Sequence, residues 1–200
     1  MIPRKKFDKK FFSSGVYDNY QALLASWVGP VAKKISKILE VKKEAKVLDV
    51  GCGFGTLLAE LQDKYNFRVA GLEYSPYAIQ KSEPSVRAKI KKGSILRLPF
   101  KKNSFDVVVC FDVIYYVNPK ETPKAIKNLI DTSRKYVFFS SLYRHSLEAS
   151  QKHNPDPLRL TVLSKKEYID FFSKNGAKLI EHFYSRNGED ILVFKKFRKI

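Results

Sequence analysis

The feature that most constrains the fold is a glycine-rich segment between two strand-like runs. The run Lys46–Val50 leads into Gly51, Gly53 and Gly55, and a second apolar run ends on Glu73. Glycine lets a chain turn tightly at a strand end and lets a ligand approach the backbone closely. An acid at the end of the next strand can accept hydrogen bonds from ribose hydroxyls. The segment therefore predicts a strand–helix–strand unit with a nucleoside site at its strand ends.

The spacing of the glycines distinguishes two classes of nucleotide ligand. The dinucleotide fingerprint has two residues between its second and third glycines, which places a pyrophosphate at a helix N-terminus. Here only one residue separates Gly53 from Gly55, and Asp49 precedes the first glycine. A carboxylate at this point repels a pyrophosphate and suits a positively charged ligand. The pattern favours S-adenosylmethionine over NAD, although glycine-rich turns occur in many doubly wound proteins and Asp49 alone could cap a helix.

Four blocks of the chain resemble the motifs of class I S-adenosylmethionine-dependent methyltransferases, especially the small members of that family. They are residues 47–55, 71–75, 92–100 and 104–113, in the order and spacing of the family. The resemblance extends over residues 30–196. It implies an α/β fold with a doubly wound, Rossmann-like sheet of seven strands. The sheet would be mostly parallel, with an antiparallel C-terminal hairpin strand and helices on both faces.

Hydrophobic periodicity predicts alternating strands and helices along most of the chain. The predicted strands lie near residues 46–50, 67–72, 88–91, 105–111 and 135–141, and the predicted helices near residues 55–65, 75–81, 121–132 and 164–175. Ser164 and Glu167 have the spacing of a capping box, and Asn175–Gly176 is a stop signal for the same helix. Two further strand-like runs flank Asn187–Gly188, the pair favoured in a two-residue hairpin turn.

The chain is expected to form one domain with an N-terminal extension. Residues 1–29 are rich in aromatic and basic side chains and are interpreted as an extension that forms a lid, and residues 30–200 as the methyltransferase domain. Val31 and Ile35 follow helical spacing, with Pro30 predicted in the first turn of that helix. No apolar run is long enough to span a bilayer and no signal peptide is recognised, so a cytoplasmic location is expected.

The resemblance also assigns cofactor-binding residues. Asp49 and the glycine backbone would hold the methionine moiety, and Glu73 the ribose hydroxyls. Family members commonly carry aspartate where this chain has Ser94, which removes a charge from the adenine contact. The complete set of predicted cofactor-binding residues is Tyr20, Asp49, Gly51, Cys52, Gly53, Gly55, Glu73, Tyr74, Ser94, Ile95 and Phe111. Cys52 and Cys110 show no metal-type or redox spacing, and are expected to be small buried residues.

The candidate catalytic residues are Asp112, Tyr115, Tyr116 and His145. Relatives that act on small molecules often have Glu-His where this chain has Tyr115 and Tyr116, so a group that titrates near neutral pH is missing there. The two tyrosines could stack on a flat acceptor or only pack. His145, His153 and Asp156 belong to a segment, residues 143–160, that could cover the acceptor pocket. A lone loop histidine is more often a surface residue, and no third ligand indicates a metal site.

The net charge of the chain does not determine the class of the methyl acceptor. The formal net charge is +18, with basic clusters at both ends and between residues 87 and 102. Such a surface attracts nucleic acid, but a lysine-rich composition of the source organism explains it equally well. The favoured prediction is methyl transfer to an oxygen, nitrogen or carbon atom of a small molecule. The alternatives are an RNA or protein acceptor, or a binding module that no longer catalyses. The sequence gives no indication of the oligomeric state.

Overall fold

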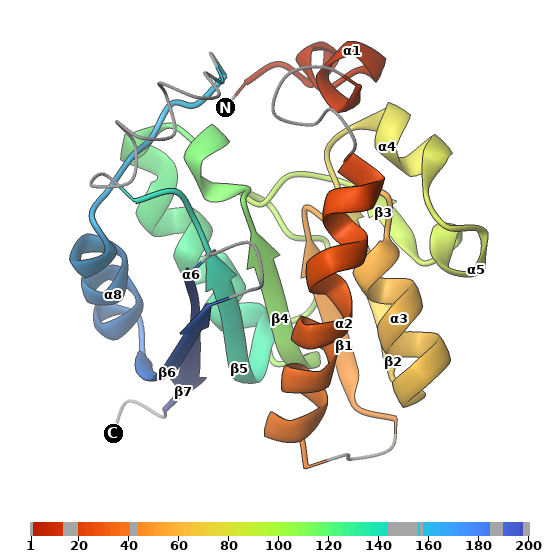
Figure 1. Ribbon diagram of the computed structural model, residues 1–200. Coiled ribbons are helices and arrows are strands. Elements are labelled where there is room, and N and C mark those ends of the chain that lie inside the picture. The colour runs from red at the N-terminus through yellow and green to blue at the C-terminus, as the bar shows by residue number, and fades with distance from the viewer. Residues whose placement is uncertain are drawn as a thin grey trace.

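A seven-stranded sheet with the order β3-β2-β1-β4-β5-β7-β6 forms the centre of the described structure (Figure 1). The computed structural model describes residues 2–13, 20–40, 44–143, 156, 158–184 and 190–197, and for residues 20–26 the backbone alone. The strands are β1 (Lys46–Val50), β2 (Arg68–Glu73), β3 (Ile90–Lys92), β4 (Phe105–Phe111), β5 (Ser133–Ser140), β6 (Ala177–Tyr184) and β7 (Asp190–Lys196).

The strand pairing confirms the predicted topology. β1 pairs in parallel with β2 and β4, and β3 and β5 extend the parallel part on either side. The strand order therefore reverses between β1 and β4, which is where a ligand binds in a doubly wound sheet. β7 runs antiparallel between β5 and β6, as expected for a C-terminal hairpin. The predicted turn at Asn187–Gly188 lies outside the described residues.

Helices cover both faces of the sheet (Figure 1). One face carries α2 (Tyr20–Ile38), α3 (Thr56–Tyr65), α4 (Pro76–Lys81) and α5 (Pro84–Arg87); the other carries α6 (Thr122–Thr132) and α8 (Lys165–Lys174). Successive strand side chains point to opposite faces. Val47 accordingly packs in the core below α2 and α3, and Leu48 in the core below α6 and α8. Apolar burial on both faces explains the continuous hydrophobic strands of the sequence.

The capping box predicted for α8 is present. The Ser164 hydroxyl accepts a hydrogen bond from the Glu167 N–H, and the Glu167 carboxylate accepts one from the Ser164 N–H at 2.8 Å. The helix ends at Lys174, and Gly176 has φ +91°, a left-handed conformation that favours glycine. The capping box and the Asn175–Gly176 stop signal therefore predicted both ends of this helix correctly.

The prediction for Pro30 is wrong. Pro30 lies inside α2, which begins at Tyr20, and not in its first turn. A proline inside a helix removes one hydrogen bond, so packing must compensate. Val28, Val31 and Ile35 place both sides of the proline in the same buried core. The division predicted at residues 29 and 30 consequently falls within a single helix.

No helix of the described residues is long and apolar enough to cross a membrane.

Candidate functional site

The glycine turn connects β1 to α3 and lies against the C-terminal end of β2. Gly51, Gly53 and Gly55 have φ values of +83°, +53° and +75°, which side chains other than glycine rarely adopt. A Cβ atom on Gly51 would lie 2.1 Å from a methyl carbon of Val113, so this turn has no room for a side chain. The Gly51 N–H donates to the carbonyl of Leu72 at 2.7 Å, which fixes the turn against the end of β2.

Glu73 is buried directly beside this turn. One carboxylate oxygen accepts a hydrogen bond from the Gly53 N–H at 2.8 Å and the other from the Ser75 N–H at 2.7 Å. Burial raises the pKa of Glu73, while the hydrogen bonds from Ser75 and Gly53 oppose that shift. The structure therefore brings the first two sequence blocks together around one carboxylate. Each oxygen keeps further acceptor capacity, which suits a pair of neighbouring hydroxyl groups.

Asp49 lies close enough to Glu73 for the two carboxylates to repel each other. Its pKa is raised from 3.8 to about 7, first by burial and then by the charge of Glu73. Two acids buried together favour a positively charged ligand, because a nearby cation offsets both the burial and the repulsion. This donor set fits the ammonium group and ribose of S-adenosylmethionine better than it fits a pyrophosphate.

Both cysteines are buried core residues, as predicted. A Cβ atom built on Gly71 would lie 2.7 Å from the sulfur of Cys52, so that sulfur packs closely against β2. Burial raises the pKa of the Cys52 and Cys110 thiols well above the usual value. A thiol with a raised pKa is a poor nucleophile near neutral pH. Cys52 takes part in the glycine turn through its backbone, whose carbonyl accepts from the Gly55 N–H at 2.8 Å.

The other predicted cofactor-binding residues occupy different surroundings. Ser94 follows β3, and its hydroxyl accepts a hydrogen bond from the Leu96 N–H at 3.1 Å. Ile95 packs in the core near α6, and its carbonyl accepts from the side-chain amide of Asn128 at 2.9 Å. Phe111 meets Trp27 of α2 edge to face at 5.6 Å. Tyr20 begins α2, and its side chain lies outside the described residues.

An aromatic cluster formed by the N-terminal segment covers the strand ends. We call residues 2–13 the lid; it contains a short 3-10 helix (Arg4–Lys6) and α1 (Lys9–Phe12). Phe7 lies between two predicted site residues, with ring centroids 5.9 Å from Tyr74 and 5.1 Å from Tyr116. The buried Ser75 hydroxyl donates to the Phe7 carbonyl and also caps α4. The sequence signal was the density of aromatic residues, but neither Phe7 nor Ser75 was singled out.

Two of the predicted acceptor residues, Tyr115 and Tyr116, belong to this cluster. Tyr115 and Tyr116 are buried in a 3-10 helix after β4, with ring centroids 4.6 Å apart. The Tyr116 hydroxyl donates to the Asp156 carboxylate at 2.6 Å. Asp112 directly follows β4 and has φ +55°, an uncommon conformation for a residue with a side chain. His145 and His153 lie outside the described residues.

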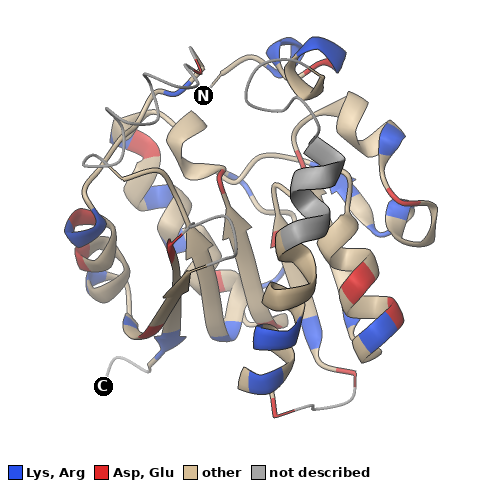
Figure 2. Cartoon of the chain, in the orientation of Figure 1, with Lys and Arg blue, Asp and Glu red and all other residues tan. Residues whose placement is uncertain are grey.

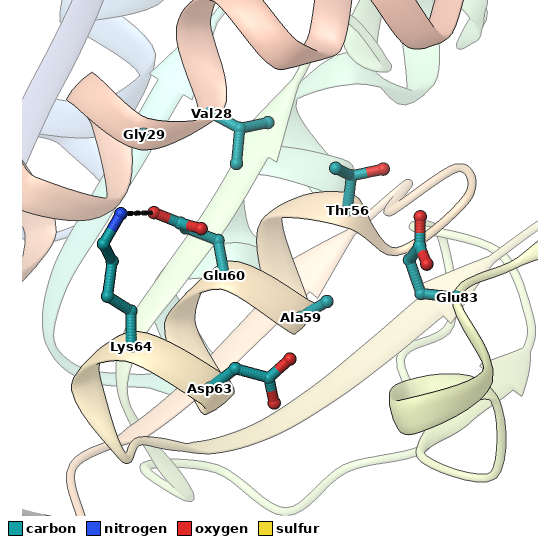
Figure 3. Close-up of a pocket in the computed structure, with 8 residues that line it drawn as sticks. All are labelled: Val28, Gly29, Thr56, Ala59, Glu60, Asp63, Lys64 and Glu83. Atoms are coloured by element: carbon teal, nitrogen blue, oxygen red, sulfur yellow. Dashed lines mark hydrogen bonds and ion pairs between the residues drawn. The ribbon is translucent and has the colours of Figure 1, made fainter.

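A separate groove of about 470 Å³ lies along α3 and does not include the strand-end residues (Figure 3). Glu60, Asp63 and Glu83 line it, and Glu60 forms an ion pair with Lys64 at 2.9 Å. Its lining comes from α2, α3 and the residue before α5. Within the described ranges, no group of three or more histidine, cysteine or acidic residues is placed to hold a metal ion.

Comparisons with known proteins agree with this arrangement. Residues 47–135 match the family model described as a methyltransferase domain. An uncharacterized methyltransferase of Schizosaccharomyces pombe is 33% identical over 127 residues, covering 56% of this chain and 45% of the relative. A demethylmenaquinone methyltransferase of Chlorobaculum tepidum is 33% identical over 111 residues, covering 54% and 42%. The chain thus spans about half the length of the curated relatives it matches.

Solved structures show that the whole fold is shared. The magnesium protoporphyrin IX methyltransferase of Synechocystis, solved with bound S-adenosylhomocysteine, superposes with a TM-score of 0.73 at 15% identity. The match covers 97% of this chain and 98% of that one. At this identity the likeness establishes the fold alone. In the domain matched at residues 47–135, in its four sequence blocks and in its fold, the chain is similar to the class I S-adenosylmethionine-dependent methyltransferases.

Proposed function

We propose that this protein binds S-adenosylmethionine at the ends of β1, β2 and β4 and transfers its methyl group to a small-molecule acceptor. The observation that carries the proposal is the buried pair Asp49 and Glu73, with Glu73 bonded to the glycine turn through Gly53 at 2.8 Å. Support comes from the methyltransferase-domain match over residues 47–135 and from a neighbour of the same fold solved with S-adenosylhomocysteine.

Each residue of the site has a role in this proposal. Asp49 neutralises the ammonium group of the methionine moiety, and Glu73 accepts hydrogen bonds from the ribose. Tyr74 lines the adenine side. When bound, S-adenosylmethionine would supply an activated methyl group, which bonds to the acceptor as its bond to sulfur breaks and S-adenosylhomocysteine leaves. The protein then mainly has to align the acceptor, a contribution of roughly 7–11 kcal/mol when orientation is good. A general base is needed only where the acceptor must lose a proton.

The lid supports a small acceptor. Phe7, Tyr74 and Tyr116 form an apolar cluster over the strand ends, which would shield the reacting groups from water once the acceptor has entered. We interpret residues 1–29 as the extension that supplies this lid. The relative from Chlorobaculum tepidum is named for a small-molecule acceptor, demethylmenaquinone. Tyr115 and Tyr116 would flank the acceptor, with Asp156 holding the Tyr116 hydroxyl.

RNA is the second candidate acceptor. The specific observation in its favour is that the outer surface of the lid is basic, with Arg4, Lys5, Lys6, Lys9 and Lys10 all exposed. A single nucleobase of an RNA is a small planar group, so it could enter beneath the aromatic cluster as a small-molecule acceptor would.

Calorimetric titration with S-adenosylhomocysteine tests the cofactor site. Glu73→Ala removes both carboxylate oxygens and should weaken binding at least roughly 30-fold, because hydrogen bonds to a charged group contribute about 1.5–3 kcal/mol each. Glu60→Ala, on the outer side of α3, is the matched control and should bind as the unsubstituted protein does. Equal affinity of the two variants for S-adenosylhomocysteine would contradict the assignment of Glu73 to the cofactor site.

The fate of a tritiated methyl group tests the acceptor. The protein is incubated with methyl-labelled S-adenosylmethionine and an extract of the source cells, and the label is separated into small-molecule, RNA and protein fractions. Label in the small-molecule fraction supports the first proposal, and label in RNA supports the second. Cofactor binding without label in any fraction would identify a binding module that does not catalyse.

A further inference from the structure

The lid is amphipathic, with an aromatic side and a cationic side. Its aromatic side chains Phe7, Phe11 and Phe12 belong to the cluster over the strand ends. Its cations Arg4, Lys5, Lys6, Lys9 and Lys10 are exposed. Asp8 is its one acid, and the Asp8 carboxylate accepts a hydrogen bond from the Phe11 N–H at 3.1 Å as the cap of α1. The lid therefore presents five exposed cations and a single acid above the candidate site.

A second group of cations lies between α4 and the loop after β3. Its members are Lys81, Arg87, Lys89, Lys91, Lys92 and Arg97, all exposed. The sequence contains no acid between Glu83 and Asp106. None of these six side chains forms an ion pair with an acid in the described ranges. Elsewhere cations are often paired, as in Arg68 with Glu44 and Lys166 with Asp170.

Aromatic contacts bring the two groups together. Phe12 of the lid stacks on Tyr77 of α4 at 6.0 Å, and the Arg4 guanidinium lies 4.7 Å from the centre of the Tyr74 ring at the end of β2. The lid therefore rests on α4, which carries Lys81 of the second group, and on the end of β2, which pairs with β3 at Lys92. In Figure 2, basic residues are present on α1 at the top of the view, on α4 below it and on α5 farther down. We call the two groups together the basic rim.

We propose that the basic rim binds the phosphate backbone of RNA across the entrance of the candidate site. The inference rests on the second acceptor candidate given above. Cations spread over the lid, α4, α5 and β3 fit a chain of successive phosphates, whereas a small anion would need only one or two of them. Lysine and arginine contacts to phosphate position a nucleic acid without reading its sequence. The nucleobase beneath the lid would then be selected by the aromatic cluster.

An anionic membrane fits this surface less well. Membrane-bound amphipathic segments place their apolar side chains outward into the lipid. In the lid, Phe7 is buried and Phe11 and Phe12 are half-buried against the cluster. The exposed large apolar residues of the described structure, Leu160, Ile180, Tyr184 and Phe197, belong to other segments. The surface thus offers charge without an exposed apolar anchor.

Fluorescence anisotropy with a labelled oligouridylate and with a transfer RNA transcript measures the binding. The logarithm of the association constant should fall linearly with the logarithm of salt concentration, because binding releases counterions. The triple substitution Lys5→Glu, Lys6→Glu and Lys9→Glu should lower that slope by about 2 for single-stranded RNA and weaken binding at least roughly tenfold. If this variant fails to fold, Lys81→Glu with Arg87→Glu tests the other half of the rim.

The matched control changes the same charge at the opposite end of the strands. Lys33 and Lys37 of α2 and Lys178 at the start of β6 are exposed. Replacing these three with glutamate should leave the salt slope and the affinity for RNA unchanged. Equal losses in both triple variants would show attraction by net charge alone and would overturn the proposal.

Two further outcomes separate this proposal from the proposed function. Titration with phosphatidylserine vesicles should give no binding at a salt concentration where RNA binds; vesicle binding that the lid substitutions abolish, without RNA binding, overturns the proposal. Calorimetry with S-adenosylhomocysteine is run on the same samples. No RNA binding at low salt by a protein that binds S-adenosylhomocysteine overturns the basic rim and leaves the cofactor site standing.

Discussion

At the scale of single residues, two buried carboxylates determine how the site responds to pH. The pKa of Asp49 is raised to about 7 by burial and by Glu73, against an ordinary value of 3.8. An unfolded chain therefore releases this proton at a lower pH than the folded protein does. The Asp49 contribution consequently reduces stability as pH rises from about 4 to about 7. The site is kept at a cost to stability, which is common where a group is arranged for binding rather than for packing.

This pKa predicts a pH-dependent affinity for the cofactor product. The ammonium group of S-adenosylhomocysteine beside Asp49 favours the carboxylate, so binding lowers the pKa and releases a proton. Affinity should therefore fall as pH drops below 7, by up to about tenfold per pH unit. Calorimetry at several pH values, in buffers with different ionisation enthalpies, measures both the affinity and the proton count. Asp49→Asn should give a weaker but flat profile; a flat profile for the unsubstituted protein would place the ammonium elsewhere.

The placement of individual residues was predictable only where the chemistry is local in sequence. Asp49, Gly51 and Glu73 could be placed together at the strand ends because the strand, the turn and the acid follow one another along the chain. The contacts of Phe7 with Ser75 and of Tyr116 with Asp156 join residues far apart in sequence. Such contacts depend on tertiary packing, which periodicity and spacing do not encode. The same limit explains why packing of Tyr115 and Tyr116 could not be distinguished from acceptor binding.

At the scale of elements, boundaries were predicted well where chemistry marks them and poorly where packing overrides it. The capping box gave the start of α8, and the hairpin signal gave the antiparallel pair β6 and β7. Pro30 was read as a helix start because proline is common there. The apolar face shared by Val28, Val31 and Ile35 instead carries α2 through the proline, since burial outweighs one lost hydrogen bond.

The lid should open independently of the rest of the fold. Phe7→Ala removes the ring between Tyr74 and Tyr116, a change that costs about 3–5 kcal/mol in a core. Here the loss cannot exceed the free energy that docks residues 2–13. Trypsin should therefore cut at Lys5, Lys6 and Lys9 at least roughly tenfold faster, with little change in Tm.

A core phenylalanine provides the comparison for the lid. Phe172 of α8 stacks on Phe194 of β7 at 3.8 Å, so Phe172→Ala should lower Tm of the whole domain. If Phe7→Ala lowers Tm as much as Phe172→Ala does, the lid is an integral part of the core and does not open alone. That result would also weaken the role of the lid in admitting an acceptor.

At the scale of the whole molecule, total charge and charge location have different consequences. A formal net charge of +18 creates repulsion summed over the entire surface, which opposes the compact state. Binding of a phosphate chain instead depends on which cations lie together around one entrance. The two triple lysine substitutions separate these effects, because they change the net charge equally at opposite ends of the strands.

Thermal unfolding at increasing sodium chloride concentration tests the first of these consequences. Salt shortens the Debye length to about 10 Å at 0.1 M and so weakens repulsion among distant cations. Tm of the unsubstituted protein should rise between low salt and about 0.5 M. Both triple variants should start from a higher Tm and rise less, by similar amounts, since long-range repulsion is insensitive to location. A Tm that falls with salt would mean that exposed ion pairs such as Arg68 with Glu44 outweigh the repulsion.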